Sequence, residues 1–95
     1  MKLRWAAEAR QQLTEVRAYI EQDNPRAAAS AVQAIRSVAD RLVAFPESGR
    51  FDPQFGVRIC AVPRTPYLLY YVLQDGTVTV VSVWHGARLW PHAPG

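Results

Sequence analysis

The amino-acid sequence predicts an α+β fold with the element order β-α-α-β-β-β, in which a helical hairpin packs on a mostly antiparallel β-sheet. Apolar residues recur at helical spacing over residues 6–44, with one break near residue 24. Residues 57–62 and 68–84 are instead rich in β-branched and aromatic residues. The chain has 95 residues, of which 49% are hydrophobic, so we expect a single domain over residues 1–95.

The first half of the chain predicts a short strand and two helices. Residues 2–5 alternate polar and apolar side chains, and residues 6–22 carry an apolar stripe at helical spacing. Asn24 is a good N-cap and Pro25 suits the first turn of a second helix, which we expect over residues 25–44. Two helices joined so closely form an antiparallel hairpin, which more often covers a sheet than forms a coiled-coil dimer.

The second half predicts three strands. We expect a loop over residues 51–56, a strand over residues 57–62, and a β-hairpin formed by residues 68–73 and 77–84. Between the hairpin strands, Asp75-Gly76 is the two-residue signal for a type I′ turn, which needs positive φ at both central positions. The strand near the N-terminus is expected to pair with an edge of this sheet.

The turn also predicts the register of the hairpin. If Gln74 pairs with Thr77, residues whose numbers sum to 151 face each other. The expected pairs are Leu73 with Val78, Tyr71 with Val80, Tyr67 with Trp84, and Pro66 with His85. This register brings Tyr67 and His85 to one rim of the sheet.

Composition excludes several classes of protein. The formal net charge of +3 is mildly basic and is compatible with either a nucleic acid or an acidic protein partner. The single cysteine, Cys60, excludes an intrachain disulfide, and we interpret it as a small core residue. The sequence has no apolar run of membrane-spanning length, no signal-peptide pattern, and no motif for a cofactor or a metal ion. We therefore expect a cytoplasmic protein without cofactors.

Candidate target-binding residues lie on the late strands, the connection between them and the tail. They are Arg58, Arg64, Tyr67, His85, Arg88 and Trp90. Arginine suits phosphate and carboxylate contacts, aromatic rings can stack on bases, and imidazole can transfer protons near neutral pH. Other roles compete with target binding: a salt bridge for Arg58 or Arg88, an exposed solvated position for Arg64, a hydrogen bond at the strand end for His85, and packing for Trp90.

An ordered set of residues along nearly the whole chain resembles the RelE/ParE superfamily of bacterial type II toxin–antitoxin toxins, and the ParE branch in particular. The set comprises Trp5, Ala9, Leu13, Tyr19-Ile20, Asn24-Pro25, Ala27-Ala28, Pro46, Gly49-Arg50, Arg58, Pro66-Tyr67, Tyr71, His85-Gly86-Ala87-Arg88 and Trp90-Pro91. The family fold has the element order predicted above. Gln12 stands where many relatives carry Asp, and we expect it to make a surface contact only.

The resemblance implies a toxin that arrests growth and is neutralised by a cognate antitoxin, with operator DNA contacted only through the antitoxin. ParE-like members act on DNA gyrase, whereas RelE-like members cut mRNA in the ribosome. On the ribonuclease alternative, the catalytic candidates are Arg58, Arg64, His85 and Arg88, which is a sparse set because Lys2 is the only lysine. The sequence therefore favours a gyrase inhibitor, with a ribosome-dependent endoribonuclease and a non-toxic protein-binding module as alternatives.

Overall fold

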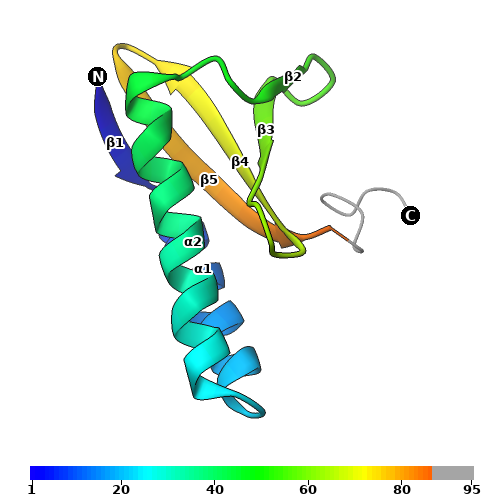
Figure 1. Cartoon of the computed structure of the whole chain (residues 1–95). Helices are drawn as coiled ribbons and strands as arrows, with labels where there is room; N and C mark the ends of the chain where they lie inside the picture. The colour runs from blue at the N-terminus through cyan, green and yellow to red at the C-terminus, as the bar shows by residue number, and fades with distance from the viewer. Residues whose placement is uncertain (87–95) are drawn as a thin grey trace.

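A computed structural model describes residues 1–86 and shows two helices packed on a five-stranded mixed sheet (Figure 1). The sheet order is β1-β5-β4-β3-β2. The elements are β1 (Lys2–Trp5), α1 (Ala7–Glu21), α2 (Pro25–Ala44), β2 (Arg50–Asp52), β3 (Val57–Ala61), β4 (Tyr67–Gln74) and β5 (Thr77–His85). The predicted α+β class is confirmed. Among the described residues, no helix is both long and apolar enough to cross a membrane.

The helical hairpin follows its local sequence signals. Asn24 caps α2 through its side-chain oxygen, which accepts a hydrogen bond of 3.0 Å from the backbone N–H of Ala27, and Pro25 occupies the first turn. The predicted bounds of the second helix are confirmed at both ends. The buried alanines Ala28 and Ala31 lie on the inner face of α2 and permit close approach of the two helices.

The sheet is antiparallel except at β1, which runs parallel to β5 with Lys2 opposite Thr77 and Trp5 opposite Val80. The expected pairing of the first strand with an edge of the sheet is therefore confirmed, and the edge is β5. The sequence did not predict β2, because two of its three residues, Phe51 and Asp52, fall at the start of the segment interpreted as a loop. Three residues with two exposed positions carry no usable period, and β2 forms because β3 pairs with it.

The hairpin register is confirmed near the turn and wrong beyond it. Gln74 lies opposite Thr77 and Tyr71 opposite Val80, but Tyr70 lies opposite Ser82, so Val81 is an extra residue in β5. This β-bulge shifts the outer half of the hairpin by one residue. As a result Tyr67 faces His85 and not Trp84. The bulge thus brings two of the predicted site residues directly opposite each other.

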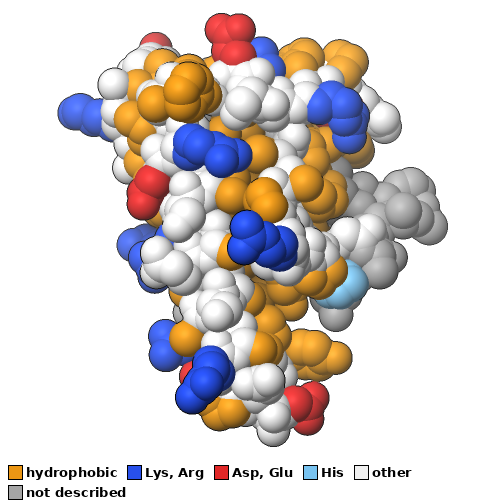
Figure 2. Space-filling view, viewed as in Figure 1, with side chains coloured by type: hydrophobic (Ala, Val, Ile, Leu, Met, Phe, Trp, Pro, Cys, Tyr) orange, Lys and Arg blue, Asp and Glu red, His pale blue; other side chains and the backbone are white. Residues whose placement is uncertain are grey.

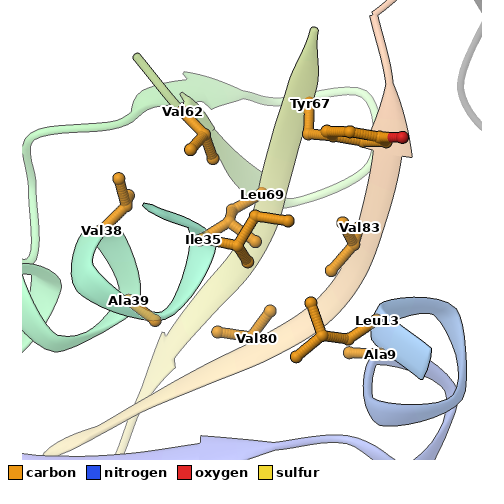
Figure 3. Close-up of a cluster of buried hydrophobic side chains, with 10 residues drawn as sticks. All are labelled: Ala9, Leu13, Ile35, Val38, Ala39, Val62, Tyr67, Leu69, Val80 and Val83. Atoms are coloured by element: carbon orange, nitrogen blue, oxygen red, sulfur yellow. The ribbon is translucent and has the colours of Figure 1, made fainter. Parts of the chain in front are cut away.

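The core lies between the helices and the sheet (Figure 3). Leu13 comes from α1, Ile35 from α2, Leu69 from β4, and Val80 and Val83 from β5, and their side chains point toward one another in Figure 3. A smaller cluster contains Leu42, Tyr71 and Val78. Burial of these apolar surfaces supplies the main favourable term in folding.

We expect Gly76→Val to lower the free energy of unfolding by about 1–3 kcal/mol, the usual range for a strained backbone position. Gly76 has a φ of 70°, and a β-branched residue resists that conformation. No atom lies within 4 Å of the place a Cβ would take, so the cost is conformational and not steric. Gly76→Asn is the matched control, because Asn tolerates positive φ. Thermal unfolding tests this; equal Tm values for Gly76→Val and the wild type would contradict the turn assignment.

Candidate functional site

The rim of the sheet is formed by Tyr67 and His85, which face each other across β4 and β5. Their ring centroids are 5.5 Å apart and the planes meet at 80°, an edge-to-face arrangement. Tyr67 is buried, with 7% of its surface exposed, and His85 is half-buried. The two predicted rim residues are therefore packed together and present only part of their surfaces to a partner.

A groove of about 1120 Å³ lies between α2 and the connection from β3 to β4, and we name it the α2 groove. Its apolar surface comes from small and aliphatic side chains, among them Ala31, Ala34 and Val38. Its cations are Arg41 and Arg64, and none of the described residues that line it is Asp or Glu. Figure 2 looks onto this side of the molecule, where apolar surface lies among blue cationic side chains and near the pale-blue histidine. The α2 groove is thus apolar with a positive border.

A second hollow, of about 530 Å³, lies between α1 and β5, and we name it the α1–β5 pocket. Gln12 and Val16 of α1 and Val83 of β5 line it. Tyr19, Tyr67 and His85 line both this pocket and the α2 groove. These three residues therefore connect the two hollows, and a molecule bound in one reaches the edge of the other.

The structure brings some of the predicted site residues together and leaves others apart. Arg64, Tyr67 and His85 all line the α2 groove, whereas Arg58 lines neither hollow. Arg64 occupies the left-handed region, with a φ of 63°, in the connection between β3 and β4. The two remaining candidates, Arg88 and Trp90, lie outside the described residues.

Arg58 has a structural environment on β3. Its Nη1 donates hydrogen bonds to the backbone oxygens of Gly49, at 2.8 Å, and Glu47, at 3.3 Å. Its guanidinium also lies 5.6 Å from the ring centroid of Phe51, within the range of a cation–π interaction. The structural role that the sequence analysis gave for Arg58 was a salt bridge. Its hydrogen bonds to Glu47 and Gly49 instead attach the chain segment after α2 to the sheet.

Tyr71 reinforces the same attachment from β4. Its side chain is completely buried, and its hydroxyl accepts from the Gly49 N–H and donates to the Pro46 carbonyl, both at 2.8 Å. Burial raises the pKa of the phenol above its ordinary value, while the Gly49 hydrogen bond acts in the opposite direction. The hydroxyl therefore stays protonated near neutral pH, as its donation to Pro46 requires. The prediction that Tyr71 is a core residue is confirmed.

The expectation that Gln12 makes only a surface contact is wrong. Its side-chain Oε1 accepts hydrogen bonds from the backbone N–H of Val83, at 2.7 Å, and from the hydroxyl of Ser82, at 3.0 Å. Val83 lies three residues beyond Val80, the last β5 residue opposite β1, so no neighbouring strand pairs with it on that side. Gln12 supplies the missing acceptor and attaches α1 to β5 beside the bulge.

We expect Gln12→Ala to lower the free energy of unfolding by about 2 kcal/mol, because it leaves a buried hydroxyl and a backbone N–H without their acceptor. Gln12→Glu keeps an acceptor oxygen and should recover part of the loss. The matched control is Gln11→Ala. The exposed side chain of Gln11 donates a hydrogen bond to Glu15, and its removal should cost less than about 0.5 kcal/mol. Urea unfolding measures all three; equal losses at positions 11 and 12 would contradict the role of Gln12.

Cys60 is partly buried on β3 and packs against both core clusters. Burial raises the pKa of its thiol, and the charge of Arg41 opposes this shift more weakly. The thiol is therefore protonated at neutral pH and is a poor nucleophile. Within residues 1–86, no three His, Cys, Asp or Glu side chains come close enough together to hold a metal ion.

Among the residues of these hollows that the sequence did not predict as site residues are Arg41 and Tyr19. Arg41 lines the α2 groove from the last turn of α2, and Tyr19 lines both hollows with 71% of its surface exposed. Both lie next to an apolar stripe on a helix. A polar or aromatic residue at the border of such a stripe indicates that the residue can line a groove. The sequence does not tell which groove until the strand or loop that packs beside the helix is known.

Comparisons with known proteins agree with this fold. The family model described as the ParE toxin of the type II toxin–antitoxin system, parDE, matches residues 3–90. The protein Y4kP of Sinorhizobium fredii is 34% identical over 90 residues, covering 95% of this chain and 93% of that protein. Toxin RelE2 of Caulobacter vibrioides is 36% identical over 85 residues, covering 90% of this chain and 94% of that toxin.

A solved structure also resembles the chain closely. A chain from the structure of the chromosomal ParDE toxin–antitoxin system from P. aeruginosa superposes with a TM-score of 0.77 and 25% identity, covering 90% of this chain and 95% of that chain. The fold and the matched length together define a toxin of the RelE/ParE superfamily. The chain belongs to the ParE toxin family of type II toxin–antitoxin systems.

Proposed function

We propose that this toxin arrests growth by inhibiting DNA gyrase. The observation that supports this proposal is the dispersal of the groups that phosphodiester cleavage would need. Arg58 is hydrogen-bonded to backbone oxygens outside both hollows, which leaves Arg64 and His85 as the described members of the candidate catalytic set that share a hollow. A ribonuclease must stabilise a phosphorane and transfer two protons, whereas a gyrase inhibitor needs only a binding surface.

The α2 groove supports a ribosome-dependent ribonuclease as the second candidate. Arg41, Arg64, Tyr67 and His85 all line this one hollow, so cations and groups capable of proton transfer share a surface there. On this alternative, the arginines would stabilise the phosphorane and His85 or Tyr67 would transfer a proton. The two candidates make different predictions for a single substitution at His85.

The experiment is induced expression of the toxin without antitoxin, followed by incorporation of labelled thymidine and labelled methionine. We expect thymidine incorporation to fall first, with DNA damage, while early translation continues. His85→Ala should weaken toxicity little, and removal of the chain from His85 onward should abolish it. Prompt loss of methionine incorporation with cleaved mRNA, reversed by His85→Ala, would establish the ribonuclease instead. Unimpaired growth would support the alternative of a non-toxic binding module.

We further propose that the cognate antitoxin occupies the α2 groove with an amphipathic segment that carries acidic residues. An apolar segment would cover the small side chains of α2. Acidic residues would pair with Arg41 and Arg64, since none of the described residues that line the groove is Asp or Glu. Because Tyr67 and His85 line the same groove, an antitoxin in this position would also cover the rim assigned to target binding. Occupation of the groove would thus account for neutralisation.

A further inference from the structure

A third hollow lies on another part of the helical hairpin. It has a volume of about 280 Å³ and is lined by side chains of α1 and α2 and by Trp5 at the end of β1. The lining residues of the helices are Arg10, Leu13, Thr14, Arg17, Val32 and Arg36. We name it the arginine pocket. It shares no lining residue with the α2 groove or the α1–β5 pocket, so a molecule bound here would not compete directly for either.

Helical geometry explains why the three arginines converge. Arg10 and Arg17 are seven residues apart on α1 and therefore lie on one face, separated by two turns. Arg36 reaches the same hollow from α2. Trp5 is partly exposed and, with Leu13 and Val32, gives the pocket an aromatic and aliphatic surface. Three arginine residues thus line a hollow that also has aromatic and aliphatic surface.

The charges of this pocket are largely uncompensated. None of the described residues that line it is Asp or Glu. Arg17 pairs with Glu21 at 3.1 Å, but both side chains are about half exposed, and such a surface pair contributes little and can exchange partners. The side chains of Arg10 and Arg36 make no hydrogen bond or ion pair with the rest of residues 1–86. Like charges held around one hollow favour an anionic ligand.

The side-chain chemistry selects the class of anion. Guanidinium presents planar donors that match phosphate oxygens. An acidic peptide would satisfy these charges equally well, but most of its side chains offer no planar ring to stack on the adjoining indole. A single-stranded nucleic acid uses both features, because cationic groups follow its phosphates while an unpaired base stacks on an aromatic ring.

We propose that the arginine pocket binds single-stranded nucleic acid, with phosphates on Arg10, Arg17 and Arg36 and a base against Trp5. The chain itself then contacts nucleic acid, in contrast to the expectation that operator DNA is reached only through the antitoxin. This inference does not depend on gyrase being the target, since the arginine pocket is separate from the rim.

The test uses the full chain, freed of antitoxin, and fluorescence anisotropy of a labelled single-stranded oligonucleotide at several salt concentrations. We expect Arg10→Gln/Arg36→Gln to weaken binding at least tenfold and to reduce the slope of log Kd against log salt by about 1.4, for two phosphate contacts at roughly 0.7 each. Trp5→Phe should keep most of the binding, and Trp5→Leu should remove the preference for single strands over duplex. Arg26→Gln is the matched control, an exposed arginine of α2 outside the pocket.

Four outcomes would overturn the proposal. One is failure of the wild-type chain to bind the oligonucleotide even at low salt. Another is an equal loss for Arg26→Gln and the double variant, which would indicate diffuse attraction by net charge. The third is equal binding of duplex and single strand by the wild type, which would remove the role of Trp5. The last is tighter binding of a polyglutamate peptide that the double variant abolishes, which would assign the pocket to an acidic protein. Circular dichroism of each variant confirms that the fold is intact.

Discussion

Tyr71→Ala is expected to lower the free energy of unfolding by about 3–5 kcal/mol, the usual cost of removing a buried aromatic side chain. Tyr71 is completely buried in the cluster with Leu42 and Val78. Its hydroxyl also joins β4 to Gly49 and Pro46, in the segment between α2 and β2. A loss of this size is a large fraction of the stability of a small domain, so the variant should be partly unfolded at physiological temperature.

Tyr71→Phe separates the two contributions. It keeps the ring in the core but leaves the Gly49 N–H and the Pro46 carbonyl without their partner, and we expect it to cost about 1–3 kcal/mol. Tyr19→Phe is the matched control, because the Tyr19 side chain is largely exposed and its loss should be near zero. Urea denaturation of the three variants measures these differences. A Tyr71→Phe protein as stable as the wild type would show that the hydrogen bonds contribute nothing net.

Replacing Arg41 and Arg64 together by Glu is expected to weaken antitoxin binding about 100-fold, equivalent to about 3 kcal/mol. Both cations line the α2 groove, and reversing their charge would oppose the acidic segment that we propose for this site. Free toxin should consequently accumulate when toxin and antitoxin are produced together, and growth should slow. Calorimetry with the purified antitoxin measures the affinity.

Arg26→Glu is the control for this pair, because Arg26 is an exposed cation of α2 that does not line the groove. It changes the overall charge in the same direction at a different place. If the control weakens binding as much per charge as the groove variants, the antitoxin recognises net charge and not the α2 groove. An unchanged affinity in the double variant would place the antitoxin elsewhere on the toxin.

The parts of the fold that the sequence predicted well depend on neighbouring residues. The bounds of α2 follow from Asn24, Pro25 and an apolar stripe within the helix itself. The turn follows from Asp75-Gly76, whose φ values are both positive. Each of these signals acts over a few residues, so it can be read without knowledge of the fold.

The parts that sequence reasoning missed depend on contacts between distant residues. Gln12 and Val83 are 71 positions apart, and nothing in the spacing near either residue indicates that they meet. The bulge at Val81 is another such case, since it matters only in relation to β4. At the site, the presence of Tyr67 and His85 at one rim was predictable because both lie at strand ends, but their direct pairing was not, because it depends on the bulge. Arg41 was not, because its role depends on where α2 lies.

The parallel pairing of β1 with β5 has a consequence for the synthesis of this toxin. Of the described strands, the first to leave the ribosome pairs with the last, since Lys2 lies opposite Thr77. The helical hairpin depends on contacts close in sequence and can form early, but the sheet must wait for the final strand, and such non-local pairing is slow. A chain whose translation stops before Thr77 has neither a partner for β1 nor the strand that carries His85. We therefore expect chains that terminate before β5 to be harmless, so that the cell is exposed to the toxin only after β5 has been translated.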